Sequence, residues 1–148
     1  MTARFLVDTN VLVYLYDARY PDKQARARDV IQVLIDTGRG VLSAQVLSEF
    51  FSASTHKFGM SPELARARLA HYTTIFPVLD LTARVVLEAA RGVIEHRLNF
   101  WDAQLWAVAY LNQIPVIFSE DFQDQSSLSG VRTVNPFHAK FRFESWIQ

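Results

Sequence analysis

Four acidic side chains stand out because the elements around them could bring them together: Asp8, Glu49, Asp102 and Asp121. Carboxylates that converge in a poorly solvated cleft repel one another, and a divalent cation is the usual way to offset that repulsion. An all-oxygen ligand set suits Mg²⁺ or Mn²⁺ better than Zn²⁺. The set therefore predicts a site for a divalent cation.

Each acid also has a structural interpretation when it is taken alone. Asp8 could cap the helix that follows it, and Asp102 could complement the dipole in the first turn of a helix. Glu49 could extend to solvent from the border of an apolar helix face, and Asp121 could be a solvated loop residue. The functional hypothesis rests on the four acids as a set, since two follow buried strands and two lie on helices that follow strands.

The elements that must position these acids begin with short apolar runs. Residues 4–7, 40–43 and 114–118 show no polar alternation, which is typical of strands buried on both faces of a parallel sheet. Asp8 directly follows the first run, and Asp121 follows the last. Residues 78–79 and 131–134 are weaker strand candidates.

Between the apolar runs, the hydrophobic spacing becomes helical. Helices are predicted over 22–36, from the cap Ser43 to Lys57, from Ser61-Pro62 to Ile75, from the cap Thr82 to Ile94, and from Asn99 to Leu111. Alternating strands and helices predict an α/β fold, a three-layer α/β/α domain with a mostly parallel central sheet. Ligands of such sheets bind off the carboxyl ends of the strands, which is where Asp8 and Asp121 are expected.

Composition narrows the class of protein further. The 148 residues are half hydrophobic, which suits a single domain over residues 1–148, and there is no internal repeat or linker. The chain has no cysteine, so disulfides, thiolate zinc sites and cysteine nucleophiles are excluded. The start of the sequence does not look like a signal peptide and no apolar stretch is long enough to span a bilayer, so we expect a cytoplasmic protein without a membrane partner. Its formal net charge is zero, so any nucleic acid must be bound by local cations and metal ions.

Several segments together resemble the PIN domains and, among them, the VapC toxins of type II toxin-antitoxin pairs. Residues 4–12, with Asp8, look like the opening strand and first acid of the family, and residues 43–50 resemble its helix with the second acid. Residues 99–103 are similar to the segment with the third acid, and residues 116–123 to the segment with the fourth. Val134-Asn135-Pro136-Phe137 looks like the closing strand and turn. The similarity spans positions 4–137, and the C-terminal aromatic tail, 138–148, inherits no role from it.

The resemblance implies that Asp8, Glu49, Asp102 and Asp121 form a Mg²⁺ or Mn²⁺ site that hydrolyses RNA, with Asn10 and Ser119 as polar supports. It also implies a homodimer and an antitoxin of the VapB type. The sequence leaves open whether Glu49 is a ligand or orients the attacking water, and whether one metal or two are bound. Two neighbouring acids, Glu120 and Asp124, could replace or assist Asp121.

Other functions remain as alternatives. The protein could be a PIN nuclease without an antitoxin, or a non-catalytic binding module. A magnesium-dependent phosphatase with Asp8 as nucleophile is disfavoured, because that chemistry usually needs a second aspartate two residues later and this chain has Asn10.

The aromatic residues divide into two groups. Phe50, Phe51, Trp101 and Trp106 have the spacing of core residues and are predicted to pack. The aromatic residues that follow the last predicted strand either pack back on the domain or meet a second subunit; they are Phe137, Phe141, Phe143 and Trp146.

Overall fold

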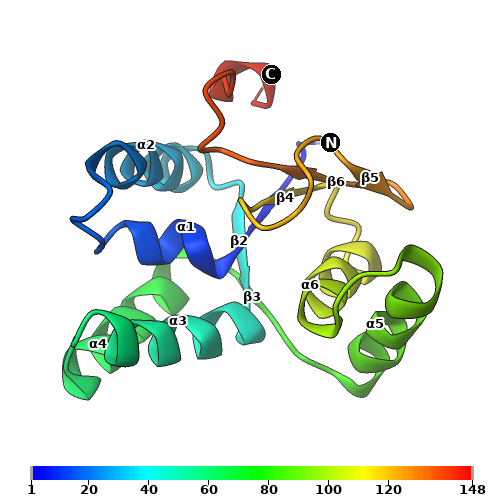
Figure 1. The fold of residues 1–148 in the computed structure, drawn as a ribbon, viewed down its shortest axis with the longest axis horizontal. Coiled ribbons are helices and arrows are strands. Elements are labelled where there is room, and N and C mark those ends of the chain that lie inside the picture. The colour runs from blue at the N-terminus through cyan, green and yellow to red at the C-terminus, as the bar shows by residue number, and fades with distance from the viewer. Residues whose placement is uncertain (1, 148) are drawn as a thin grey trace.

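A six-stranded sheet runs through the middle of the protein (Figure 1) in the computed structural model, which describes residues 2–147. Its strands, in the spatial order β3-β2-β1-β4-β6-β5, are β3 (Val78–Leu79), β2 (Gly40–Ser43), β1 (Phe5–Val7), β4 (Val116–Phe118), β6 (Val131–Val134) and β5 (Ser127–Leu128). All neighbouring strands are parallel except β5, which pairs antiparallel with β6. The predicted mostly parallel sheet is thus confirmed.

The two central strands are apolar because both of their faces are covered. Every residue of β1 and β4 is buried, and Phe5 lies opposite Val116 while Leu6 lies opposite Ile117. The rings of Phe5 and Phe118 stack with their centroids 4.9 Å apart. The absence of polar alternation in these segments follows from this double burial.

The order of the strands reverses at the pair β1 and β4. From β1 the chain adds β2 and β3 on one side, and it then returns to place β4 on the other side of β1. The loops that leave β1 and β4 therefore part in opposite directions at the carboxyl edge of the sheet. In open α/β sheets this switch point is where ligands bind.

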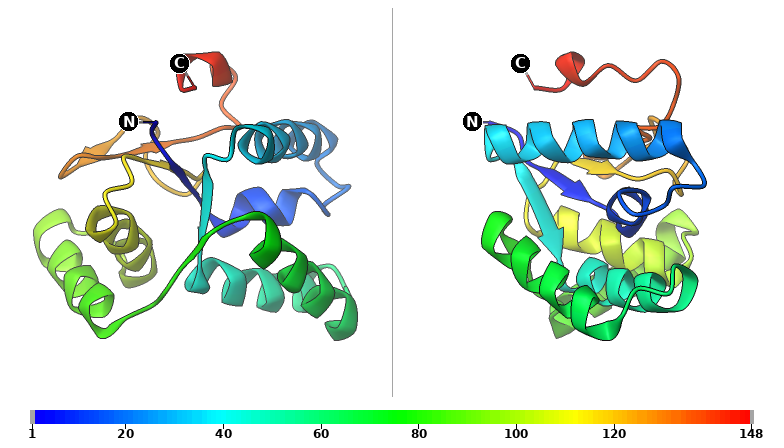
Figure 2. Two further views of the ribbon diagram at one scale, coloured as in Figure 1. Left: turned by 180° about the vertical axis from the view of Figure 1, so that it is seen from behind. Right: turned by 90° about the vertical axis from the view of Figure 1, so that its left-hand side faces the viewer.

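Helices cover both sides of the sheet: α1 (Thr9–Tyr14), α2 (Pro21–Thr37), α3 (Ala44–Lys57), α4 (Pro62–Ile75), α5 (Ala83–His96) and α6 (Phe100–Leu111). A 3₁₀ turn, η1 (Phe143–Ser145), lies near the C-terminus. Figures 1 and 2 show α1 to α4 on one side of the sheet and α5 and α6 on the other, as the predicted three-layer α/β/α architecture requires. In the described part of the chain, no helix combines the length and apolar character needed to cross a membrane.

Four of the five predicted helix starts are confirmed by their caps, and α2, predicted from residue 22, begins at Pro21 without a side-chain cap. In each of the four a side-chain oxygen accepts a hydrogen bond from the backbone N–H three residues later, which satisfies one of the unpaired donors of the first turn. The capping residues are Ser43, Ser61, Thr82 and Asn99. These polar residues mark where strands and loops turn into helices.

Three features differ from the sequence-based expectation. Helix α1 was not predicted, because its six residues are too few to show a helical period, and the two-residue strand β5 was not predicted either. The assignment of Trp101 to the core is wrong: its side chain is 63% exposed, whereas Trp106 of the same helix is buried as expected. Trp101 lies in the first turn of α6.

The aromatic tail packs back on the domain. The ring of Phe141 is buried and lies 5.8 Å from that of Phe118, while Phe143 makes an edge contact with Phe5. Arg26 of α2 donates to the carbonyl of Pro136 and lies over the ring of Phe141. The tail and α2 thus cover the same side of the central strands.

Candidate active site

Asp8 lies at the carboxyl end of β1, at the switch point of the sheet. Its backbone N–H donates to the carbonyl of Phe118 on β4, 3.0 Å away. The residue is only 6% exposed, and its carboxylate accepts hydrogen bonds from the backbone N–H of Thr9 and the hydroxyl of Ser119, both at 2.7 Å. Asp8 is also the N-cap of α1, so the structural and functional interpretations of this residue are compatible.

Ser119 links the two acids that follow β1 and β4. Its hydroxyl donates to Asp8 Oδ2 and accepts from the backbone N–H of Asp121 at 3.1 Å. Asn10 Nδ2 donates to the same hydroxyl at 3.3 Å. The buried serine therefore fixes the start of the Asp121 loop relative to Asp8, and Asn10 fixes the serine.

Glu49 projects from α3 and is held at both carboxylate oxygens. The hydroxyl of Thr9 donates to Oε2 at 2.9 Å, and Gln45 Nε2 donates to Oε1 at 2.8 Å. Gln45 also donates to the carbonyl of Trp101 and accepts from Gln104 Nε2 at 2.9 Å. This buried amide network joins α3 to α6 and sets the direction of the Glu49 side chain.

Asp102 lies in the first turn of α6 and is held by its cap. Asn99 Oδ1 accepts from the backbone N–H of Asp102 at 3.0 Å, and Asn99 Nδ2 donates to the Asp102 carboxylate at 2.6 Å. The capping residue thus also orients the acid. As with Asp8, a role in the helix terminus and a place in the site occur together.

All four predicted acids line one cavity of about 290 Å³, whose walls are Asp8, Gln45, Glu49, Trp101, Asp102, Leu105 and Asp121. We call this the acidic cavity. Within residues 2–147, no three acidic or histidine side chains lie close enough together to coordinate a single metal ion. The structure therefore brings the four carboxylates to one cavity without placing them around one point.

The electrostatics of the acidic cavity disfavour its negative charges. Burial raises the pKa of Asp8 to about 7, although the hydrogen bonds from Ser119 and Thr9 act in the opposite direction. The charges of Asp121 and Glu49 raise it further. Burial, and then the same two charges, also raise the pKa of Asp102. An added positive charge would stabilise both ionised carboxylates.

The residues of the acidic cavity fit a divalent cation of the magnesium type. Its carboxylates are hard oxygen ligands, and Mg²⁺ usually keeps several waters, which suits acids that surround a cavity rather than one point. Asn10 Oδ1 is in addition a buried oxygen with no hydrogen-bond partner among the described residues. An uncompensated acceptor beside clustered carboxylates is a further sign that a cationic or water ligand suits this place.

The two neighbouring acids that could replace Asp121 are engaged elsewhere. Glu120 forms an ion pair with Lys23 at 2.8 Å and accepts a hydrogen bond from the hydroxyl of Tyr14. Asp124 accepts from the backbone N–H of Asn135 at 2.7 Å. Neither lines the acidic cavity. The geometry therefore favours Asp121 as the fourth acid.

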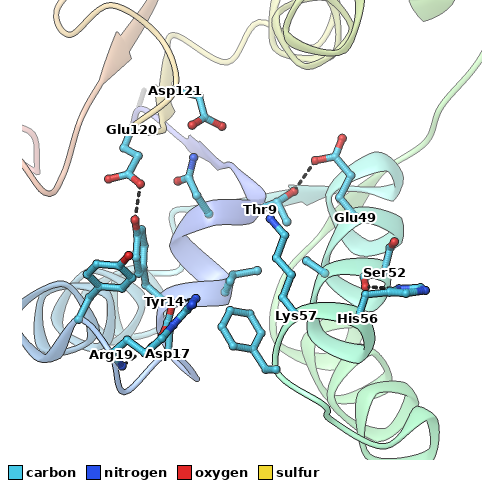
Figure 3. A pocket seen from close by; sticks show the side chains of 15 residues that line it. Thr9, Tyr14, Asp17, Arg19, Glu49, Ser52, His56, Lys57, Glu120 and Asp121 are labelled. Carbon is cyan, nitrogen blue, oxygen red and sulfur yellow. Dashed lines mark hydrogen bonds and ion pairs between the residues drawn. The ribbon is translucent and has the colours of Figure 1, made fainter.

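A groove of about 600 Å³ leads away from the acidic cavity between α1 and α3. Glu49 and Asp121 lie where the two spaces meet, and Figure 3 shows Arg19, Lys57 and His56 farther along the groove. Lys57 points toward Thr9 (Figure 3) and forms no ion pair within the described residues. We call this space the cationic groove after Arg19 and Lys57; Asp17, Glu49, Glu120 and Asp121 also line it, and Arg19 is paired with Asp17.

Sequence reasoning missed the residues that hold the acids. Thr9, Gln45, Asn99 and Gln104 were not singled out as parts of the site. Gln45 and Glu49 are four residues apart on one helix, a spacing at which side chains meet, so this pair had a detectable signal. Gln104 had none, because only the packing of α6 on α3 brings it to Gln45.

Fold and site together define an α/β protein with a carboxylate-lined cavity at the switch point of a parallel sheet. The chain belongs to the PIN domain family, whose model matches residues 5–128. No curated protein matches the chain in sequence.

Solved structures share this fold at low sequence identity. A chain of a toxin-antitoxin complex from Klebsiella pneumoniae is 19% identical, with a TM-score of 0.65 over 88% of this chain and 96% of that one. VapC20 of Mycobacterium tuberculosis, a sarcin-ricin loop cleaving toxin, is 23% identical, with a TM-score of 0.61 over 86% and 98% of the two chains. A chain of the DNA-bound VapBC complex of Salmonella typhimurium is 15% identical, with a TM-score of 0.65 over 88% and 96%.

Proposed function

We propose that the protein is a metal-dependent endoribonuclease that hydrolyses RNA phosphodiester bonds and acts as the toxin of a toxin-antitoxin pair. The observation that carries the proposal is the meeting of four carboxylates in one cavity with a groove that bears cations. Membership of the PIN family and the similarity in fold to a sarcin-ricin loop cleaving toxin support RNA as the substrate.

Asp8, Asp102 and Asp121 would hold Mg²⁺ or Mn²⁺ directly or through water. When bound, such an ion lowers the pKa of a water molecule and offsets charge on the phosphate. Glu49 is a ligand or orients the attacking water. Because Thr9 and Gln45 each donate to one of its oxygens, the Glu49 carboxylate is kept as a hydrogen-bond acceptor with a fixed direction.

The remaining residues of the site position the acids and the substrate. Ser119 and Asn10 hold Asp8 and the Asp121 loop together at the base of the acidic cavity. Lys57 and Arg19 in the cationic groove would bind phosphates that flank the cleaved bond. A chain with zero net charge can attract RNA in this way, since only local cations need to reach the phosphates.

The proposal includes two protein partners. An antitoxin of the VapB type would block the site, and the similarity in fold to chains of toxin-antitoxin complexes supports it. A homodimer would bury the apolar side chains that α5 leaves exposed, among them Leu87 at 73% and Ile94 at 79% exposure. Co-expression with the protein encoded directly upstream tests the toxin role: we expect growth arrest when the chain is produced alone and rescue by that neighbour.

The nuclease activity is tested by incubating the purified protein with single-stranded and structured RNA and Mg²⁺ or Mn²⁺. We expect cleavage that EDTA stops. Asp102→Asn should lower the rate about a thousandfold or more, because it removes one negative charge from the cavity and leaves its shape intact. Asp29→Asn, at an exposed position of α2, is the matched control and should cut RNA like the wild type. Undiminished cleavage by Asp102→Asn would contradict the site.

A further inference from the structure

Trp101 is the most exposed tryptophan of the site region, although it directly precedes Asp102. It occupies the second position of α6, and 63% of its side chain is exposed. An exposed indole normally costs hydrophobic free energy, so its position beside a polar cavity suggests that it meets a ligand.

Trp101 borders both the acidic cavity and a second space of about 390 Å³, lined by Gln45, Ser48, Glu49, Leu81, Trp101 and Gln104. The surface of this second space is mostly apolar, and Leu81 at its edge is 46% exposed. Gln45, Glu49 and Trp101 line both spaces. The apolar space is therefore a direct continuation of the acidic cavity, on the side that α6 and the segment after β3 provide.

One ring contact and one backbone hydrogen bond position Trp101. The ring of Phe100 contacts it edge to face, with centroids 5.3 Å apart and an interplanar angle of 76°. The carbonyl of Trp101 accepts a hydrogen bond from Gln45, the residue that also holds Glu49. The backbone that carries the indole is thus fixed relative to one of the four acids, and the contact with Phe100 restricts the ring, which limits the entropy lost when a ligand stacks on it.

We propose that Trp101, together with Leu81, forms a stacking subsite for an unpaired nucleobase adjacent to the phosphate that is cleaved. This inference rests on the proposed ribonuclease function. A phosphodiester at the acids carries a nucleoside on each side, and the apolar space is contiguous with the acidic cavity. Proteins that bind single-stranded RNA commonly stack splayed bases on aromatic side chains, and stacking tolerates any base because each has a π-face.

The subsite is tested by RNA affinity in the Asp102→Asn background, so that the probe is not cut. The probe is a short, fluorescently labelled single-stranded RNA of mixed sequence, and its anisotropy reports binding. Trp101→Ala should weaken binding about 10- to 100-fold, and Trp101→Phe should stay within about threefold of the parent, because a phenyl ring still stacks. Leu64→Ala, which truncates an exposed apolar side chain on α4, is the matched control and should bind like the parent.

Tryptophan fluorescence provides a second readout. RNA should quench the emission of the parent protein, and Trp101→Phe should bind RNA without that quenching, which would place the base on this ring. Unchanged affinity in Trp101→Ala, or quenching that persists in Trp101→Phe, would overturn the subsite; unchanged affinity would leave the apolar space to a protein partner. Cleavage by the wild-type protein is measured first, so a failure of the proposed function is seen separately as the absence of any cleavage.

Discussion

The acidic cavity and the cationic groove meet at Glu49 and Asp121 but are built in different ways. In the acidic cavity, Asp8 is buried and its carboxylate is fixed by hydrogen bonds from Thr9 and Ser119. In the cationic groove, the side chain of Lys57 is exposed. Arg19 is also exposed and forms an ion pair with the buried Asp17. Bond cleavage needs groups held within a fraction of an ångström, whereas flanking phosphates need only a charge within reach. Substitutions in the two regions should therefore differ in the size and kind of their effects.

The largest effect is expected when Asp8→Asn removes the buried charge, and it is an effect on the stability of the fold. The Asp8 pKa of about 7 in the fold lies well above the ordinary value of 3.8, so the folded state binds the proton more tightly than the unfolded state. The stabilisation by this proton is complete below about pH 4 and is lost as the pH rises through 7. At pH 8 the ionised carboxylate costs at most roughly 4 kcal/mol. Asp8→Asn should raise the melting temperature by several degrees at pH 8 and change it little at pH 4.

Mg²⁺ sharpens this test because a bound cation should remove the same cost. The melting temperature of the wild type at pH 8 should rise with millimolar Mg²⁺, and that of Asp8→Asn should rise much less. Differential scanning calorimetry measures both series. Asp29→Asn, which changes an exposed carboxylate on α2, should follow the wild type. Equal stabilisation of Asp8→Asn by Mg²⁺ would show that the cation does not bind beside this carboxylate.

A smaller effect is expected for Ser119→Ala, which removes the hydroxyl between Asp8 and the Asp121 loop. Both acids stay in the chain but lose a common support, so the apparent affinity for Mg²⁺ or the cleavage rate should fall about 10- to 100-fold. Measuring the cleavage rate at increasing Mg²⁺ concentrations distinguishes a loss of metal affinity from a loss of the rate at saturating Mg²⁺. The control is Ser127→Ala, at an exposed position of β5. If Ser119→Ala behaved like this control, the positions of Asp8 and Asp121 would not depend on the bridge.

The smallest effect is expected in the cationic groove. Lys57→Ala should weaken binding of RNA by a few-fold and lower the slope of log affinity against log salt by about 1, without changing the rate at saturating RNA. Lys140→Ala, which removes an exposed cation from the tail, should change neither quantity. A loss of rate at saturation in Lys57→Ala would mean that the two regions do not divide their roles as proposed.

The sequence predicted those parts of the molecule that depend on local chemistry. Buried strands such as 116–118 were visible because both faces are apolar, and caps such as Ser43 marked the helix starts. What could not be predicted depends on contacts between distant elements. Gln104 joins the site only through its hydrogen bond to Gln45 on α3, and Trp101 is exposed although its spacing resembles that of a core residue. The spacing of Asp121 from Ser119 already favoured Asp121 over Glu120. The ion pair and hydrogen bond that occupy Glu120 come from Lys23 and Tyr14, which lie about a hundred residues away in the chain and could not be foreseen.

The pairing of β1 with β4 has a consequence for the moment at which the site forms. The hydrogen bond from Ser119 to Asp8 joins residues 111 positions apart, and Phe5 pairs with Val116 across a similar span. Contacts between such distant residues form late in folding, because the entropy cost of closing a long loop must be met before the contacts can stabilise the chain. During synthesis, a ribosome-bound chain that ends before β4 lacks Ser119 and Asp121. The acidic cavity is therefore completed only when most of the chain has been made, and an unfinished chain has no assembled site.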